Sequence, residues 1–135
     1  MKDILEIVDN SIKDDPFIMK YVDVIQDIYY NQYPPVESIN RPIIVLDEID
    51  EPRPVEFGDN NIIAYSYLIQ INVYTKGTSK FNARKIRNEI SQRIADLLRE
   101  KLSMNNTSSG KPEYDEDYDL YLSVRRFEGT FYFEK

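Results

Sequence analysis

The middle of the chain, residues 62–75, alternates apolar side chains with other residues. The apolar and aromatic side chains fall at every second position: Ile63, Tyr65, Tyr67, Ile69, Ile71 and Val73. Because successive side chains of a β-strand point to opposite faces of its sheet, this spacing predicts one long strand with a continuous apolar face.

The period of the pattern changes after residue 76. Gly77 interrupts the alternation, and Thr78 or Ser79 is suited to cap the N-terminus of a helix. Over residues 80–102 the apolar positions follow a helical period of about 100° per residue. They are Ala83, Ile86, Ile90, Ile94, Leu97 and Leu98. The strand and this helix can bury their apolar faces against each other, so we expect the pair to form the core.

The first fifty residues predict three further elements. Apolar residues at helical spacing indicate a short helix over residues 2–14. Residues 17–30 fit either a helix or a strand, and we favour a brief helix to about residue 21 followed by a strand to about residue 33. The apolar run at 43–46 indicates a buried strand over residues 42–50.

Two segments are predicted as loops. Residues 51–61 contain two prolines and a glycine between two strands that can form an antiparallel hairpin. Residues 103–115 are small and polar and have the composition of a flexible loop. In the last strand, over residues 119–134, the apolar positions change parity between Val124 and Phe127, which predicts a β-bulge or a tight turn at Glu128-Gly129.

These elements predict one α+β domain over residues 1–135. Its sheet would be antiparallel, with about four strands, and two helices would pack on one face. Flexible loops are expected at about residues 51–61 and 103–115.

Composition narrows the range of functions. The chain has no Cys and no His, which excludes disulfides, thiolate metal sites and imidazole chemistry. Its formal net charge of −7 argues against a nucleic-acid backbone as the main partner. No apolar run approaches the roughly 20 residues of a membrane helix, and the N-terminus does not resemble a signal peptide. We therefore expect an intracellular, non-enzymatic protein without a cofactor or metal and without a membrane partner.

One acidic cluster follows the strand at 42–50 and consists of Asp47, Glu48, Asp50 and Glu51. Carboxylates of this kind can bind Mg²⁺ or Ca²⁺, as in metal-dependent nucleases. Neighbouring acids on a strand point to opposite faces, however, and Lys76 lies at the far end of the next strand. A solvated strand end is therefore the favoured interpretation, as it is for the second acidic cluster at 113–119.

The helix at 80–102 reverses the sign of the charge. Its bases outnumber its acids in a chain that is otherwise acidic. This pattern fits a solvated helix face with weak ion pairs, and it fits equally a basic face that meets acids of a neighbouring copy. For such a subunit interface we predict the residues Arg84, Arg87, Arg93, Asp47 and Asp50.

The order of these features resembles the tail-completion or tail-terminator (head–tail joining) proteins of long-tailed bacteriophages and prophages. The resemblance covers nearly the whole chain. It is carried by the short first helix, a strand leading to Tyr33-Pro34-Pro35, the run Arg41-Pro42-Ile43-Ile44-Val45-Leu46, a tip loop, a strand ending in residues 69–75, the helix start at 79–86 and a final strand containing arginines.

The resemblance implies a virion structural protein that forms a hexameric ring at the head–tail joint. Such a homo-oligomer caps the tail tube and lines the channel through which DNA passes. Its partners would be the tail tube protein and a head-completion or connector protein. It would be assembled in the cytoplasm of the host bacterium.

Two other functions stay open at this point. One is a metal-dependent hydrolase or nuclease that uses Asp47 and Asp50. The other is an acidic regulatory protein that mimics DNA. The large number of acidic residues supports this alternative, and the basic helix argues against it.

Overall fold

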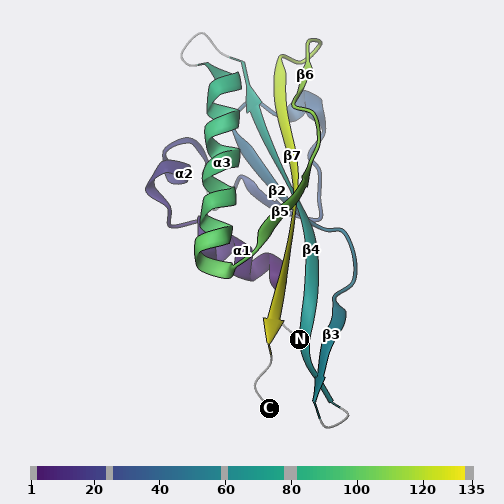
Figure 1. Ribbon diagram of the computed structural model, residues 1–135. Helices are drawn as coiled ribbons and strands as arrows, with labels where there is room; N and C mark the ends of the chain where they lie inside the picture. The colour runs from purple at the N-terminus through teal and green to yellow at the C-terminus, as the bar shows by residue number, and fades with distance from the viewer. Residues whose placement is uncertain (1–2, 24–25, 59–60, 78–81, 133–135) are drawn as a thin grey trace.

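A long antiparallel pair of strands runs along the length of the fold, with the α-helices on one side of it (Figure 1). The computed structural model describes residues 3–23, 26–58, 61–77 and 82–132 of the 135-residue chain. In chain order the elements are α1 (Ile4–Ile12), α2 (Pro16–Tyr21), β1 (Ile28–Tyr30), the short 3₁₀ helix η1 (Val36–Ser38), β2 (Ile43–Glu48), β3 (Arg53–Gly58), β4 (Asn61–Lys76), α3 (Ala83–Leu102), β5 (Asn105–Ser109), β6 (Glu113–Asp115) and β7 (Leu120–Tyr132).

The sheet is built around β4 and β7. These two strands pair from Lys76 opposite Leu120 to Ala64 opposite Tyr132. Strands β2 and β3 both pair with β4, at opposite ends of its length, and β1 lies parallel to β2. Strands β5 and β6 both pair with β7.

The predicted architecture of about four antiparallel strands and two helices is therefore wrong. Within the described residues the sheet has seven strands and is mixed, and three α-helices accompany it. Two of the extra strands, β5 and β6, are short and exposed, so they carry no apolar alternation that would reveal them in the sequence. The third, β3, lies in the segment with two prolines that the sequence predicts as a loop. Among the residues that the structure describes, no helix is long and apolar enough to cross a membrane.

The predicted packing of the central strand on the helix is confirmed. Ile69, Ile71 and Val73 of β4 lie in one buried cluster with apolar residues of α1, α2 and α3. Ile90 and Ile94 are buried in the same cluster. This side of the sheet is called the helix face below.

The opposite side of the sheet, called the open face below, has a smaller core. Ile43 and Val45 of β2, Leu120 of β7 and Ile39 of the η1 segment are buried together there, with Tyr74 against them. Both faces of the sheet are thus apolar at β2, and the start of β7 adds Leu120 to the core of the open face.

This second core explains why the predicted bulge at Glu128-Gly129 is wrong. The register between β4 and β7 is unbroken along the whole strand. Leu120 lies in the core of the open face and Phe127 in the core of the helix face. The apolar side chains change parity because the two halves of β7 are covered on different faces.

The two predicted loops also contain strands. β3 occupies much of residues 51–61, and β5 with β6 occupies much of residues 103–115. Pro54 is tolerated because β3 pairs on one side only, with β4. All residues of β5 and β6 are exposed, so backbone pairing with β7 holds these segments rather than burial.

The start of α3 differs from the prediction as well. Its N-cap is Asn82, whose side chain accepts a hydrogen bond from the backbone N–H of Lys85 at 3.1 Å. The predicted caps Thr78 and Ser79 lie outside the described residues, as do Val24 and Ile25 of the predicted first strand.

Candidate functional site

The predicted acidic cluster at the end of β2 does not form a single site, because its side chains have different exposures and different hydrogen-bond partners. Asp47 is half-buried on the open face, and its carboxylate accepts a hydrogen bond from the hydroxyl of Tyr33. Glu48 is exposed, and its carboxylate accepts a hydrogen bond from Asn31 at 3.3 Å. Asp50 is exposed beyond the end of the strand. Nowhere in the described part of the chain do three or more acidic side chains come close enough to hold a metal ion.

Asp47 belongs to a polar row that crosses the open face. It lies opposite Gln70 of β4, which lies opposite Arg126 of β7. The Arg126 guanidinium donates to the Gln70 amide oxygen at 3.1 Å. Partial desolvation and the hydrogen bond to Asp47 raise the pKa of Tyr33 to about 12, so this hydroxyl stays protonated at neutral pH. Asp47 therefore has polar neighbours within the chain itself, Tyr33 and Gln70.

Two of the three predicted interface arginines form contacts within the chain itself. Arg87 is only 4% exposed; it donates to the carbonyl oxygen of Glu113 at 3.3 Å and lies over the ring of Tyr121. Arg93 donates to the carboxylate of Asp15 at 2.6 Å. Their role in a subunit interface stays a prediction.

Arg84 differs from these two residues. It is exposed, and within the described residues it forms no ion pair. Of the three arginines, Arg84 therefore presents its charge most openly to a neighbouring molecule.

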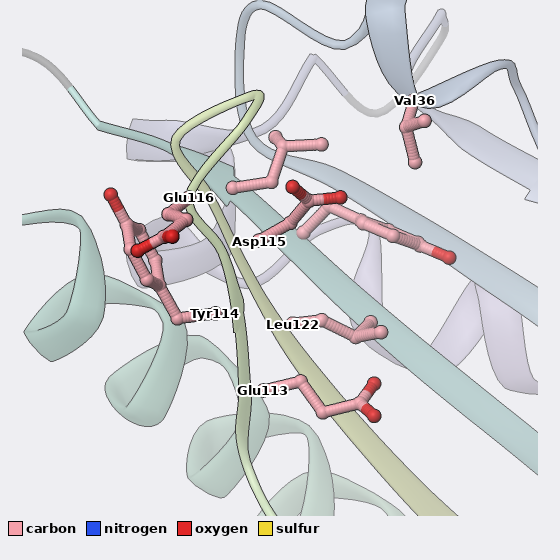
Figure 2. Close-up of a pocket in the computed structure, with 8 residues that line it drawn as sticks. Val36, Glu113, Tyr114, Asp115, Glu116 and Leu122 are labelled. Atoms are coloured by element: carbon pink, nitrogen blue, oxygen red, sulfur yellow. The ribbon is translucent and has the colours of Figure 1, made fainter.

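A pocket that the sequence analysis missed lies on the open face, between η1 and β6 (Figure 2). Its volume is about 420 Å³, within the usual range of roughly 300–1,000 Å³ for ligand sites. The residues that line it are Val36, Tyr74, Glu113, Tyr114, Asp115, Glu116, Leu120 and Leu122. It has an apolar floor and a carboxylate rim.

The alternation of β6 determines which groups reach this pocket. Glu113 lies opposite Leu122 and Asp115 opposite Leu120, so both acids point to the open face. Tyr114 points the other way (Figure 2). It packs on Tyr121, with 4.5 Å between the ring centroids. The Glu-Tyr-Asp sequence of β6 was the available signal, but it was interpreted as part of an acidic loop.

The carboxylates of the rim differ in their hydrogen bonds within the chain. Asp115 accepts hydrogen bonds from the backbone N–H groups of Asp117 at 3.0 Å and Tyr118 at 3.4 Å, which shape the turn after β6. The side chains of Glu113 and Glu116 are exposed and form no ion pair with any described residue. Glu113 points to the open face, so its carboxylate is available to a cation in the pocket. Figure 2 shows the Glu116 carboxylate on the other side of β6, beside Tyr114.

Tyr114 and Asp119 fix the other side of the same turn. The Tyr114 hydroxyl donates to the Asp119 carboxylate at 2.9 Å. This hydrogen bond, followed by desolvation, raises the pKa of Tyr114 to about 12. The hydroxyl therefore remains a donor at neutral pH, and the turn that carries the rim is held in place.

The residues that line the pocket determine which kind of group can bind in it. None of its lining residues is basic, so its carboxylates attract a cation. Leu120, Leu122 and Val36 offer an apolar surface to whatever carries that cation. Lysine and arginine combine an apolar stem with a charged head and meet both requirements. The pocket is therefore suited to a basic side chain of a protein partner.

Neither the protein-family models nor the curated proteins give a match to this chain.

Proposed function

We propose that this chain is a non-enzymatic structural subunit that assembles with copies of itself into a ring at the head–tail joint of a long-tailed bacteriophage. In this position the ring caps the tail tube. The observation that supports assembly is an apolar arm formed by β3 and the start of β4.

The arm extends beyond the helices at one end of the subunit (Figure 1). Phe57 and Ile62 lie opposite each other on it and are 66% and 39% exposed. Val55 on the same strand is 43% exposed. Among the described strands β3 pairs only with β4, so its outer edge keeps open backbone hydrogen-bonding groups. An exposed apolar edge strand of this kind favours association with another chain.

The position at the head–tail joint is supported by the order of elements in the sequence and by its charge. A formal net charge of −7 suits a DNA channel, because repulsion between carboxylates and phosphates keeps the passing DNA from binding. On this proposal the partners are further copies, six in a ring by the resemblance, the tail tube protein and a head-completion or connector protein. The protein is then a virion component that is assembled in the bacterial cytoplasm.

The metal-dependent hydrolase has less support. It requires Asp47 and Asp50 to bind one ion, yet Asp47 is bound by Tyr33 and Asp50 is exposed beyond the strand end. No observation in the described part of the chain adds a third ligand to this pair.

The proposal is tested by measuring mass in solution and binding to tails. Light scattering across a range of protein concentrations is expected to show a closed oligomer, and electron microscopy is expected to show rings on the ends of purified tail tubes. Phe57→Lys, in the arm, is expected to reduce assembly.

A matched control is Met19→Lys, which introduces the same charge at an exposed apolar residue of α2, outside the arm. It is expected to leave assembly unchanged. A protein that stays monomeric at every concentration and does not bind to tail ends would overturn the proposal.

A further inference from the structure

The first turn of α3 carries two exposed bases, Arg84 and Lys85, and no acid. The N-terminus of a helix has a partial positive charge, so bases in this turn are unfavourable for the helix itself. Arg84 also repels the buried Arg87: after burial, this repulsion is the second cause that lowers the Arg87 pKa. Stability of the subunit therefore does not explain why these bases are present.

Their contacts within the subunit are weak. The ammonium of Lys85 lies 3.8 Å from Glu89, one turn further along the helix. Exposed pairs of this kind contribute little to stability and are easily exchanged for another partner. Arg84 has no ion pair with a described residue. Both charges are thus available to a neighbouring molecule.

The pocket on the open face offers the complementary surface. Glu113 supplies a free carboxylate at its rim, and Leu122 lies opposite Glu113 in the floor. The pocket and the first turn of α3 lie at the same end of the subunit, since Arg87, one turn after Arg84, binds the backbone of Glu113. They lie on opposite sides of β6, with α3 on one side and the pocket on the other (Figure 2).

We propose that the first turn of α3 in one copy docks into this pocket of the next copy. Arg84 would pair with Glu113 while its stem covers Leu122, and Lys85 would add a second positive charge beside the acidic rim. The inference rests on the proposed self-assembly and names the surfaces that carry it. Within one subunit β6 and the sheet separate the two surfaces, so the contact forms between copies.

The placement of the two surfaces determines what kind of assembly they produce. A contact between two different patches of the same chain is heterologous and continues from copy to copy. Both patches lie at one end of the subunit but on opposite faces of its sheet, so successive copies can stand side by side at one level. A rotation between such copies closes a ring.

Charge reversal tests the contact. Arg84→Glu places an acid opposite Glu113 of the next copy, and Glu113→Lys places a base opposite Arg84. Each variant alone is expected to self-associate at least about tenfold more weakly than the original chain, as expected for like charges at an interface. An equimolar mixture is expected to restore assembly, because every contact between unlike chains then joins opposite charges.

Arg99→Glu and Glu100→Lys are matched controls, because they make the same charge changes at exposed residues near the other end of α3. Circular dichroism establishes that each variant is folded, and light scattering measures its mass. Assembly by both single variants would overturn the docking contact while leaving the proposed ring intact.

Two other outcomes would also overturn this contact. If Glu113→Lys blocks assembly and Arg84→Glu does not, the pocket receives another segment. If both block assembly but the mixture does not restore it, the two residues do not meet. A monomeric original chain that does not bind tail ends would instead refute the proposed function.

Discussion

Arg93 of α3 binds Asp15 at the N-terminus of α2, although the two residues are far apart in the sequence. Two guanidinium nitrogens donate to the same carboxylate oxygen, at 2.6 and 3.0 Å. The other oxygen accepts a hydrogen bond from the backbone N–H of Ile18 at 3.2 Å. Asp15 thus caps α2 and joins it to α3 with one side chain that is only 4% exposed.

Asp15→Ala is expected to lower the free energy of unfolding by about 1–3 kcal/mol. The change removes a helix cap, typically about 1 kcal/mol, and leaves Arg93 without its acid. Because the Arg93 side chain is 40% exposed, water compensates for part of that loss. Urea unfolding measures the effect, and Asp14→Ala, at the exposed neighbouring residue, is the control. Equal free energies of unfolding for the two variants would show that the cap and the ion pair of Asp15 do not stabilise the fold.

The same pair predicts a dependence of stability on pH. The hydrogen bonds from Arg93 lower the pKa of Asp15 below its ordinary value, although burial acts in the opposite direction. The carboxylate therefore loses its proton more readily in the folded protein. Its contribution to stability is complete above the unfolded pKa of about 3.9 and is lost as the pH falls through the lower folded pKa.

Unfolding of the original chain and of Arg93→Gln at several pH values tests this dependence. The difference in their free energies of unfolding is expected to be largest near neutral pH and to shrink below about pH 4. A difference that stays constant across this range would show that Asp15 does not carry the effect.

Gly129 of β7 is predicted to be required for the packing of Met104. A Cβ atom at this position would lie 2.7 Å from Cγ and 3.4 Å from Cα of the fully buried Met104. Gly129→Ala is expected to lower the free energy of unfolding by about 1–3 kcal/mol through overpacking. Gly110→Ala is the control, because its nearest side-chain contact would be an ordinary 3.7 Å, with Val124. Thermal unfolding of both variants decides whether the two glycines differ.

Arg87 is predicted to hold β6 against α3. Its guanidinium contacts the Glu113 carbonyl, the Tyr121 ring and the Asn88 side chain, with no carboxylate partner among the described residues. Arg87→Ala is expected to destabilise the protein by about 2 kcal/mol and to speed amide exchange in β6.

Arg87→Met is the informative companion variant. It retains most of the packing and removes a charge whose burial lowers its own pKa, so it is expected to cost less stability than Arg87→Ala. Hydrogen exchange at residues 113–115 and 120–122 measures the attachment of β6. Unchanged exchange in both variants would show that Arg87 does not hold this strand.

The candidate site was only partly accessible from the sequence. The helical period placed Arg84, Arg87 and Arg93 on one basic helix, but it did not reveal that Arg87 is buried or that Arg93 binds Asp15. Both facts depend on which segments pack beside α3. The sequence shows that Glu113 and Asp115 are acidic. That both acids point to one face of the sheet and Tyr114 to the other follows only from the pairing of β6 with β7.

The sequence by itself determined the central strand, the long helix and their contact. Each buries one continuous face, and that burial imposes a period of two in β4 and of 3.6 in α3. The tertiary structure decided the short strands β3, β5 and β6, the second core on the open face and the pocket beside it. β5 and β6 are held by backbone hydrogen bonds to the distant β7, which any sequence of residues other than proline can form. For that reason these two strands leave no periodic pattern in the sequence.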